Sequence, residues 1–165
     1  MSKISVLMSV YKKENPEYLR ASLESILVQT RTADEILLIE DGPLTQELYQ
    51  VVAEYQKKCD YLHVHAMEQN VQLGRALAKG VELCQYDLIA RMDTDDIAMP
   101  DRLEKEGAYM EAHPEVNVVG GAIREFNDEG TIDRVKNMPK TQEEILEYVK
   151  VRNPLNHMTV MYRKD

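Results

Sequence analysis

Short apolar runs alternate with amphipathic stretches through the first part of the chain. Four runs rich in Ile, Leu and Val predict β-strands, over residues 3–10, 35–39, 62–66 and 87–92. Between them, apolar side chains recur every three or four positions, which predicts helices over residues 16–29, 45–58 and 75–84. This alternation predicts an α/β fold, with a Rossmann-like, mostly parallel sheet flanked by helices and joined by right-handed crossovers.

The regular alternation stops after this part of the chain. Pro100 and Asp101 open a further helix, since proline is favoured in the first turn. Three short strands are then predicted over residues 116–120, 122–127 and 131–134. A turn at residues 128–130 would join the last two strands into a hairpin.

The end of the chain predicts one more helix and one more strand. Thr141 and Glu144 have the spacing of a capping box, which marks the start of a helix. A last strand is predicted over residues 158–162. We therefore expect a single domain over residues 1–165, whose C-terminal part is mixed or antiparallel.

Length, charge and cysteine content narrow the class of protein. The 165 residues are enough to bury one core without disulfides. Acidic residues (29) exceed scattered basic residues (20), which argues against nucleic acid as a partner. Cys59 and Cys84 lack the spacing of a zinc site. There is no signal pattern and no apolar stretch of ~18 residues, so we expect a cytoplasmic chain without a transmembrane segment.

The fourth predicted strand ends in a dense group of carboxylates, Asp93, Asp95 and Asp96. In an extended backbone, residues two apart project to the same side about 6.5 Å apart, so Asp93 and Asp95 can share one cation. Oxygen ligands of this kind suit Mg²⁺ or Mn²⁺, which commonly bind substrate phosphates through one or two carboxylates. The same acids also fit a turn that caps the next helix, so both interpretations stay open.

A second predicted strand also ends in acids, at Glu40 and Asp41. In open parallel sheets, ligands bind beyond the carboxyl ends of the strands, near the point where the strand order reverses. We therefore expect Asp41 and the acids at 93–96 to border one crevice.

Five segments, in this order, resemble family 2 glycosyltransferases, which have the GT-A fold: Ser9 to Tyr11, Ile39 to Gly42, Asn70 with Gly74, Ala90 to Asp96, and Asn153 to Thr159. The resemblance spans essentially the whole chain. It implies a nucleotide-diphosphate sugar donor, such as a UDP-sugar, and transfer with inversion at the anomeric carbon. It also implies a Mn²⁺ or Mg²⁺ ion that bridges donor and protein.

The resemblance further implies which half of the chain binds each substrate and where in the cell the protein acts. Residues 1–100 would form the nucleotide-binding half, and residues 101–165 would begin the acceptor-side half. The acceptor would be a saccharide or a lipid-linked molecule, in the synthesis of cell-surface polysaccharide or glycolipid. The full-length protein would then act in the cytoplasm, peripherally at the inner face of the membrane.

Roles for individual acids follow from their places in the matching motifs. Asp41 matches the acid that contacts uracil or another base, and its carboxylate can accept the ring N–H. Asp93 matches the first acid of the DxD motif, near the ribose and a metal-bound water. Asp95 matches the second acid, the direct metal ligand. Asp96 either supports this site or caps the helix that follows, and we favour the cap.

Other residues near these motifs allow two interpretations each. Tyr11 either flanks the nucleobase or is an exposed loop tyrosine. Arg75 either approaches the diphosphate or is solvated on a helix. Arg91 either approaches the diphosphate or, because it lies on a strand between apolar neighbours, pairs with a nearby aspartate.

The chain also departs from the family pattern. Glu40 stands where Asp is usual, and Gln72 occupies a loop position often held by Gly. In the family, the Asp that deprotonates the acceptor follows some distance beyond the segment that holds His157. We therefore expect this base to lie beyond Asp165, so that a chain truncated there binds donor without transferring the sugar. His157 is the alternative candidate, because an imidazole titrates near neutral pH.

Other functions remain open at this point, with different expected signatures. A nucleotidyltransferase would carry a Gly-rich basic loop after the first strand, but Tyr11 to Glu14 contain no glycine. A phosphatase with a nucleophilic Asp-x-Asp motif would place it after the first strand, whereas here it follows the fourth. A non-catalytic nucleotide-binding module would keep the fold and the donor-side acids without turnover.

Overall fold

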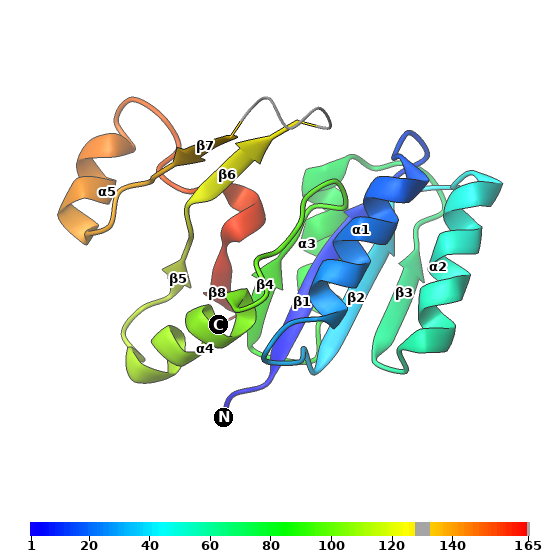
Figure 1. The fold of residues 1–165 in the computed structure, drawn as a ribbon, viewed down its shortest axis with the longest axis horizontal. Coiled ribbons are helices and arrows are strands. Elements are labelled where there is room, and N and C mark those ends of the chain that lie inside the picture. Colours follow the sequence, from blue (N-terminus) through cyan, green and yellow to red (C-terminus); the bar gives the residue numbers. More distant parts are fainter. Residues whose placement is uncertain (128–132, 165) are drawn as a thin grey trace.

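A computed structural model describes residues 1–127 and 133–164 and has a six-stranded sheet at its centre (Figure 1). The spatial order of its strands is β3 (Leu62–Ala66), β2 (Glu35–Glu40), β1 (Ile4–Val10), β4 (Leu88–Arg91), β8 (Met161–Arg163) and β5 (Val118–Val119). The first four strands run parallel, and β8 is antiparallel to both of its neighbours. The mostly parallel α/β sheet with a mixed C-terminal part is therefore confirmed.

Helices cover both faces of this sheet. They are α1 (Pro16–Leu27), α2 (Gln46–Lys58), α3 (Leu73–Leu83) and α4 (Arg102–Ala112), whereas a short α5 (Gln142–Tyr148) lies to one side (Figure 1) and buries no residue. Alternate side chains of β1 point to opposite faces, so Met8 packs into the core beneath α1 and α2 while Leu7 packs beneath α3. Gly80 lets α3 approach the sheet closely, because a Cβ there would overlap the Leu7 side chain.

Two predicted helix starts, those of α1 and α5, are confirmed by their caps, whereas α4 begins at Arg102 rather than at the predicted Pro100 and Asp101. The Asn15 side chain accepts a hydrogen bond from the backbone N–H of Glu17 (2.9 Å), just before Pro16. At α5, Thr141 Oγ1 accepts from Glu144 N (3.2 Å) and Glu144 Oε2 accepts from Thr141 N (3.3 Å). This reciprocal pair is the capping box expected from the sequence.

Several predicted boundaries in the last third are wrong. The strand expected over 158–162 is shorter, because residues His157–Thr159 form a 3₁₀ turn, η1, and β8 begins only at Met161. The amide and hydroxyl of Thr159 both donate to the carbonyl of Asn156 (2.9 and 2.8 Å), which closes the turn. The strand expected over 116–120 shrinks to β5, because Val116 N donates to His113 O (3.0 Å) in a turn after α4.

The hairpin is confirmed as a separate two-stranded sheet. Strands β6 (Ile123–Phe126) and β7 (Asp133–Lys136) pair antiparallel and lie to one side of the main sheet with α5 (Figure 1). The turn predicted at 128–130 lies outside the described residues.

Helix α3 begins at Leu73, earlier than expected, so the polar loop before it is shorter than predicted.

The strand order places the reversal point between β1 and β4. After β1, the chain adds β2 and β3 on one side, and then returns to place β4 on the other side of β1. The carboxyl ends of β1, β2 and β4 therefore meet at one edge, where ligands bind in such sheets.

Among the described residues, no helix has the length and apolar character needed to cross a membrane.

Candidate functional site

A cleft of about 440 Å³ opens at this edge of the sheet. Its lining includes Tyr11 after β1, Asp41 after β2, and Asp93 and Asp95 after β4. The structure therefore brings together four of the five donor- and metal-site residues predicted from the sequence. The fifth, Arg75, is exposed on the first turn of α3 and does not line the cleft, so its role stays a prediction.

The carboxylates of Asp93, Asp95 and Asp96, after β4, form one compact cluster, which we call the acid group. Oxygens from Asp93, Asp95 and Asp96 all lie within 4.8 Å of one another. Burial, followed by repulsion from Asp93 and Asp95, raises the pKa of Asp96 to about 6, while Arg91 and Arg102 oppose this shift. Three hard oxygen donors this close fit a Mg²⁺ or Mn²⁺ ion, which would offset their mutual repulsion.

Asp96 does not cap the next helix, so the role favoured from the sequence is wrong. Helix α4 begins at Arg102, its N-cap residue is Asp101, and the Asp101 side chain makes no capping bond. The chain between Asp96 and α4 is irregular, which leaves the Asp96 carboxylate with the other two acids.

Buried hydroxyl groups hold the loop that carries these acids. Thr94 Oγ1 donates to Glu14 Oε2 (2.5 Å), and Ser22 Oγ donates to the backbone carbonyl of Asp93 (2.8 Å). Ser25 Oγ accepts from Ala98 N (3.0 Å) farther along. These bonds tie the loop to α1 and to the segment after β1. No local pattern predicts these bonds, because the partners are 70 or more positions apart.

Asp41 organises the neighbouring loop as well as lining the cleft. It is 4% exposed, and its two carboxylate oxygens accept from Val71 N (2.6 Å) and Asn70 Nδ2 (2.9 Å). Gly42 has a φ of 84°, and a Cβ there would lie 2.5 Å from Asn70 N, so the close approach requires glycine. Each Asp41 oxygen keeps a second lone pair, which leaves it able to accept from a ligand.

Gln72 adopts a backbone conformation that is unusual for its type. With φ 72° and ψ 152°, it lies in a region occupied almost only by glycine. The residue also lines the cleft at the start of α3. Backbone strain is thus placed directly at the site, where the sequence departs from the glycine usual in the resembled family.

Two residues lie close to Asp93, Arg91 at the end of β4 and His157 in η1. Arg91 Nη2 forms an ion pair with Asp93 Oδ1, which confirms the expected aspartate partner for this buried arginine. His157 Nδ1 lies 3.8 Å from Asp93 Oδ2. Among the described residues, no ion pair involves Asp95, which is exposed to the cleft. Asp95 is therefore the acid most available to a cation.

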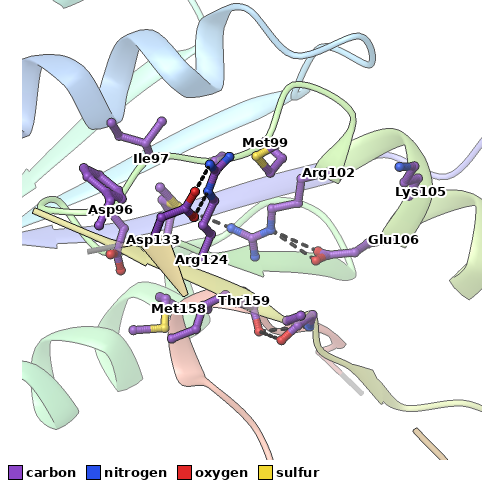
Figure 2. Close-up of a pocket in the computed structure, with 16 residues that line it drawn as sticks. Asp96, Ile97, Met99, Arg102, Lys105, Glu106, Arg124, Asp133, Met158 and Thr159 are labelled. Atoms are coloured by element: carbon purple, nitrogen blue, oxygen red, sulfur yellow. Dashed lines mark hydrogen bonds and ion pairs between the residues drawn. The ribbon is translucent and has the colours of Figure 1, made fainter. Parts of the chain in front are cut away.

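A second cavity, of about 730 Å³, lies on the other side of the acid group. It is enclosed by four segments: the loop with Asp96 and Met99, helix α4, the β6–β7 hairpin, and η1 (Figure 2). Its lining is mainly apolar. The sequence did not predict this cavity, because its walls come from segments that show no shared pattern.

Two ion pairs border the second cavity (Figure 2). Arg124 Nε and Asp133 Oδ1 pair across the hairpin at 2.6 Å, and Arg102 Nε lies 3.2 Å from Glu106 Oε1 within α4. Burial raises the pKa of Glu106 to about 6, although Arg102 opposes the shift. The cavity thus has an apolar lining with paired charges at its border.

Comparison with known sequences gives consistent matches. A family model described as "Glycosyl transferase family 2" matches residues 5–165. An uncharacterized glycosyltransferase of Haemophilus influenzae is 48% identical over 99% of this chain and 61% of its own length. The amylovoran biosynthesis glycosyltransferase AmsE of Erwinia amylovora is 45% identical over 98% of this chain and 60% of its own length.

A third relative has a more specific name. The UDP-Gal:alpha-D-GlcNAc-diphosphoundecaprenol beta-1,3-galactosyltransferase of Escherichia coli is 35% identical over 98% of this chain and 58% of its own length. The chain therefore spans about three fifths of the length of these relatives.

Solved structures share the fold. Residues 1–349 of S. aureus TarS in complex with UDP-GlcNAc align with a TM-score of 0.75 and 20% identity, over 98% of this chain and 45% of that one. The mannosyltransferase PcManGT of Pyrobaculum calidifontis, in complex with GDP-Man and Mn²⁺, aligns with a TM-score of 0.66 and 16% identity, over 75% and 36% of the two chains. At these identities the likeness shows the fold alone, and it confirms the expected GT-A architecture.

Proposed function

Because the chain belongs to glycosyl transferase family 2, we propose that its cleft binds a nucleotide-diphosphate sugar, such as a UDP-sugar, together with a divalent cation. The observation that carries this proposal is the grouping of Asp41, Asp93 and Asp95 on one cleft at the ends of β2 and β4. The relatives named for amylovoran biosynthesis and for a GlcNAc-diphosphoundecaprenol substrate support a role in polysaccharide or glycolipid synthesis.

The acid group would hold the cation. Asp95 is the direct ligand in this proposal, because it is exposed to the cleft and no described residue forms an ion pair with it. Asp93 contributes its Oδ2 side, since Oδ1 faces Arg91. When bound, Mn²⁺ or Mg²⁺ supplies positive charge that stabilises the departing nucleoside diphosphate.

The nucleoside would lie between the ends of β1 and β2. Tyr11 is 45% exposed at the cleft, which leaves its ring free to flank a base. Asp41 is buried but retains acceptor capacity toward a uracil N–H. Arg75 is exposed on α3 and would reach the diphosphate only by extending toward the cleft.

The larger cavity would serve the acceptor, within the half that begins at residue 101. It meets the donor cleft at the acid group, through Asp96. An apolar wall suits a sugar face or the lipid part of a lipid-linked acceptor. A lipid-linked acceptor would bring the whole protein to the inner face of the membrane as a peripheral enzyme.

Transfer also needs a general base, which we place outside residues 1–165. Residues 153–164 contain no Asp or Glu, and His157 Nδ1 lies 3.8 Å from Asp93 Oδ2. A positioned base contributes about 10² to 10⁴ in rate, so this chain should bind donor and transfer sugar poorly. Transfer at the rate of the whole protein, lost in His157→Ala, would instead identify His157 as the base.

A thermal-shift series with nucleotides tests the donor proposal directly. UDP and UDP-sugars should raise the unfolding midpoint when Mn²⁺ is present and should do so far less in EDTA, because only the native state binds them. ATP and cation-free buffer serve as comparison conditions. Equal shifts for all nucleotides, with or without Mn²⁺, would contradict a metal-dependent nucleotide-sugar site and would fit a general nucleotide-binding module.

A further inference from the structure

The Arg91 guanidinium lies buried beside the acid group. Its side chain is 5% exposed, and Nη2 forms an ion pair with Asp93 Oδ1. Nε, Nη1 and Nη2 have no hydrogen bond of good geometry to any atom of the described residues. An arginine stays charged at any ordinary pH, so this positive charge is permanent and poorly screened by solvent.

The backbone at Arg91 is fixed from both sides. Arg91 N donates to Val160 O (2.9 Å), and Arg91 O accepts from Arg102 Nη2 (2.8 Å). The neighbouring Asp93 carbonyl is held by Ser22. The positive charge and the carboxylate that it faces are therefore held in a defined relation, whatever occupies the cleft.

Resting on the proposed function, we infer that Arg91 is a positioning residue that also sets the charge of the acid group. It orients Asp93 and cancels one of the three negative charges, so that a divalent cation alone binds weakly and a cation with a nucleoside diphosphate binds well.

The charge balance explains why binding of the cation alone and binding of the nucleotide should respond in opposite ways to the loss of Arg91. With Arg91, the three carboxylates carry a net charge of about minus two, which one divalent cation neutralises. Without Arg91, one negative charge remains after the cation binds, and it repels the diphosphate. Removal of Arg91 should therefore strengthen binding of the cation alone and weaken binding of the nucleotide.

Other basic groups nearby do not replace Arg91. Arg102 approaches Asp96, but its charge is already paired with Glu106 at 3.2 Å. His157 is 57% exposed and carries a charge only when protonated. Arg91 thus provides a buried and permanent positive charge in direct contact with the acid group.

Two substitutions of Arg91 and one matched control test this inference. Arg91→Met removes the charge at similar length, and Arg91→Lys retains a charge. Arg163→Met is the control, because Arg163 on β8 donates to the carbonyls of Val116 (3.1 Å) and Met110 (2.7 Å) and lies beside the far end of β4. Unfolding midpoints identify folded variants, and Arg91→Gln replaces Arg91→Met if the latter lacks a cooperative transition.

Two affinities are measured for each variant: free Mn²⁺ by electron paramagnetic resonance, and UDP at saturating Mn²⁺ by calorimetry. Arg91→Met should bind free Mn²⁺ at least about threefold more tightly and UDP about tenfold more weakly. Arg91→Lys should stay within about threefold of the unmodified chain in both measurements, because the charge remains. Arg163→Met should change neither.

Parallel weakening of both affinities in Arg91→Met, or no change in either, would overturn the inference, since a purely structural residue cannot shift them in opposite directions. The same opposite shifts in Arg163→Met would also overturn it. Failure of the proposed function gives a different result: the unmodified chain itself would then show no Mn²⁺-dependent UDP binding.

Discussion

The two halves of the chain differ in how they are stabilised. Nearly all fully buried apolar residues lie before residue 100, and the later described residues contribute only Leu103, Met110 and Met161. In the later half, apolar side chains such as Phe126 (58% exposed) and Leu146 (54%) face solvent, and α5 buries no residue. The cleft at the carboxyl ends of β1, β2 and β4 is therefore built on a well-packed core, whereas the walls of the second cavity include weakly packed elements.

This contrast separates two tasks in the proposed function. A cation and a diphosphate need carboxylates held in place before binding, and buried bonds such as Ser22 to Asp93 provide this. Acceptors vary more in shape, and a wall formed partly by a two-stranded hairpin can adjust to them at low cost. Substitutions in the two halves should therefore differ in how strongly they change stability and binding.

Truncation of one apolar side chain in each half should give the largest difference, measured as the loss in free energy of unfolding. Leu38 on β2 is fully buried, and Leu38→Ala should lower the free energy of unfolding by about 2 to 5 kcal/mol. Leu146→Ala removes the same atoms from α5, where the side chain is 54% exposed, and should cost less than about 0.5 kcal/mol. Urea denaturation measures both, and similar losses would contradict the contrast.

Removal of the Asp41 carboxylate should weaken nucleotide binding. Asp41→Ala should cost about 1.5 to 3 kcal/mol in UDP affinity, the range for a hydrogen bond to a charged group. Free Mn²⁺ affinity should hardly change, because Asp41 lies outside the acid group. A crystal structure with UDP whose base lies far from Asp41 would show that this role is wrong.

The buried Glu106 should make stability depend on pH. Its pKa rises from 4.5 in the unfolded chain to about 6 when folded, so it binds a proton more tightly in the native state. The resulting stability, about 2 kcal/mol, is fully present below pH 4.5 and is lost as the pH rises through about 6. Glu106→Gln should flatten the pH profile of unfolding in this window, and an unchanged slope would contradict the assignment.

Relief of the strain at Gln72 should give the smallest effect. Gln72→Gly should stabilise the fold by about 0.5 to 1 kcal/mol, because glycine adopts the observed positive φ without a Cβ penalty. Gly42→Ala is the opposing control and should destabilise, since its new Cβ would meet Asn70 N at 2.5 Å. A lower thermal midpoint for Gln72→Gly would mean that the residue is not strained in solution.

Much of the fold was predictable because its signals are local. Parallel strands buried on both faces are continuous apolar runs, so β1 to β4 could be assigned within one or two residues of their observed ends. The place of Asp41 and Asp93 followed from the rule for ligand sites in such sheets. Both signals require only the residue pattern and the chain order.

The remainder depends on contacts between distant segments. The assignment of residues 158–162 to a strand failed because Thr159 folds back on Asn156, which apolar periodicity does not reveal. The role of Asp96 was misjudged because it depends on where α4 begins. The backbone strain at Gln72 and the second cavity likewise arise only when the chain is folded.

The central claim is that Asp95 holds a cation which in turn holds the diphosphate. The most direct test is calorimetry of UDP with and without Mn²⁺ for the unmodified chain, Asp95→Ala, and the control Asp60→Ala, whose exposed carboxylate precedes β3. Asp95→Ala should lose the Mn²⁺-dependent part of UDP affinity and keep its unfolding midpoint, and Asp60→Ala should retain both. Undiminished Mn²⁺-dependent UDP binding in Asp95→Ala would contradict the claim.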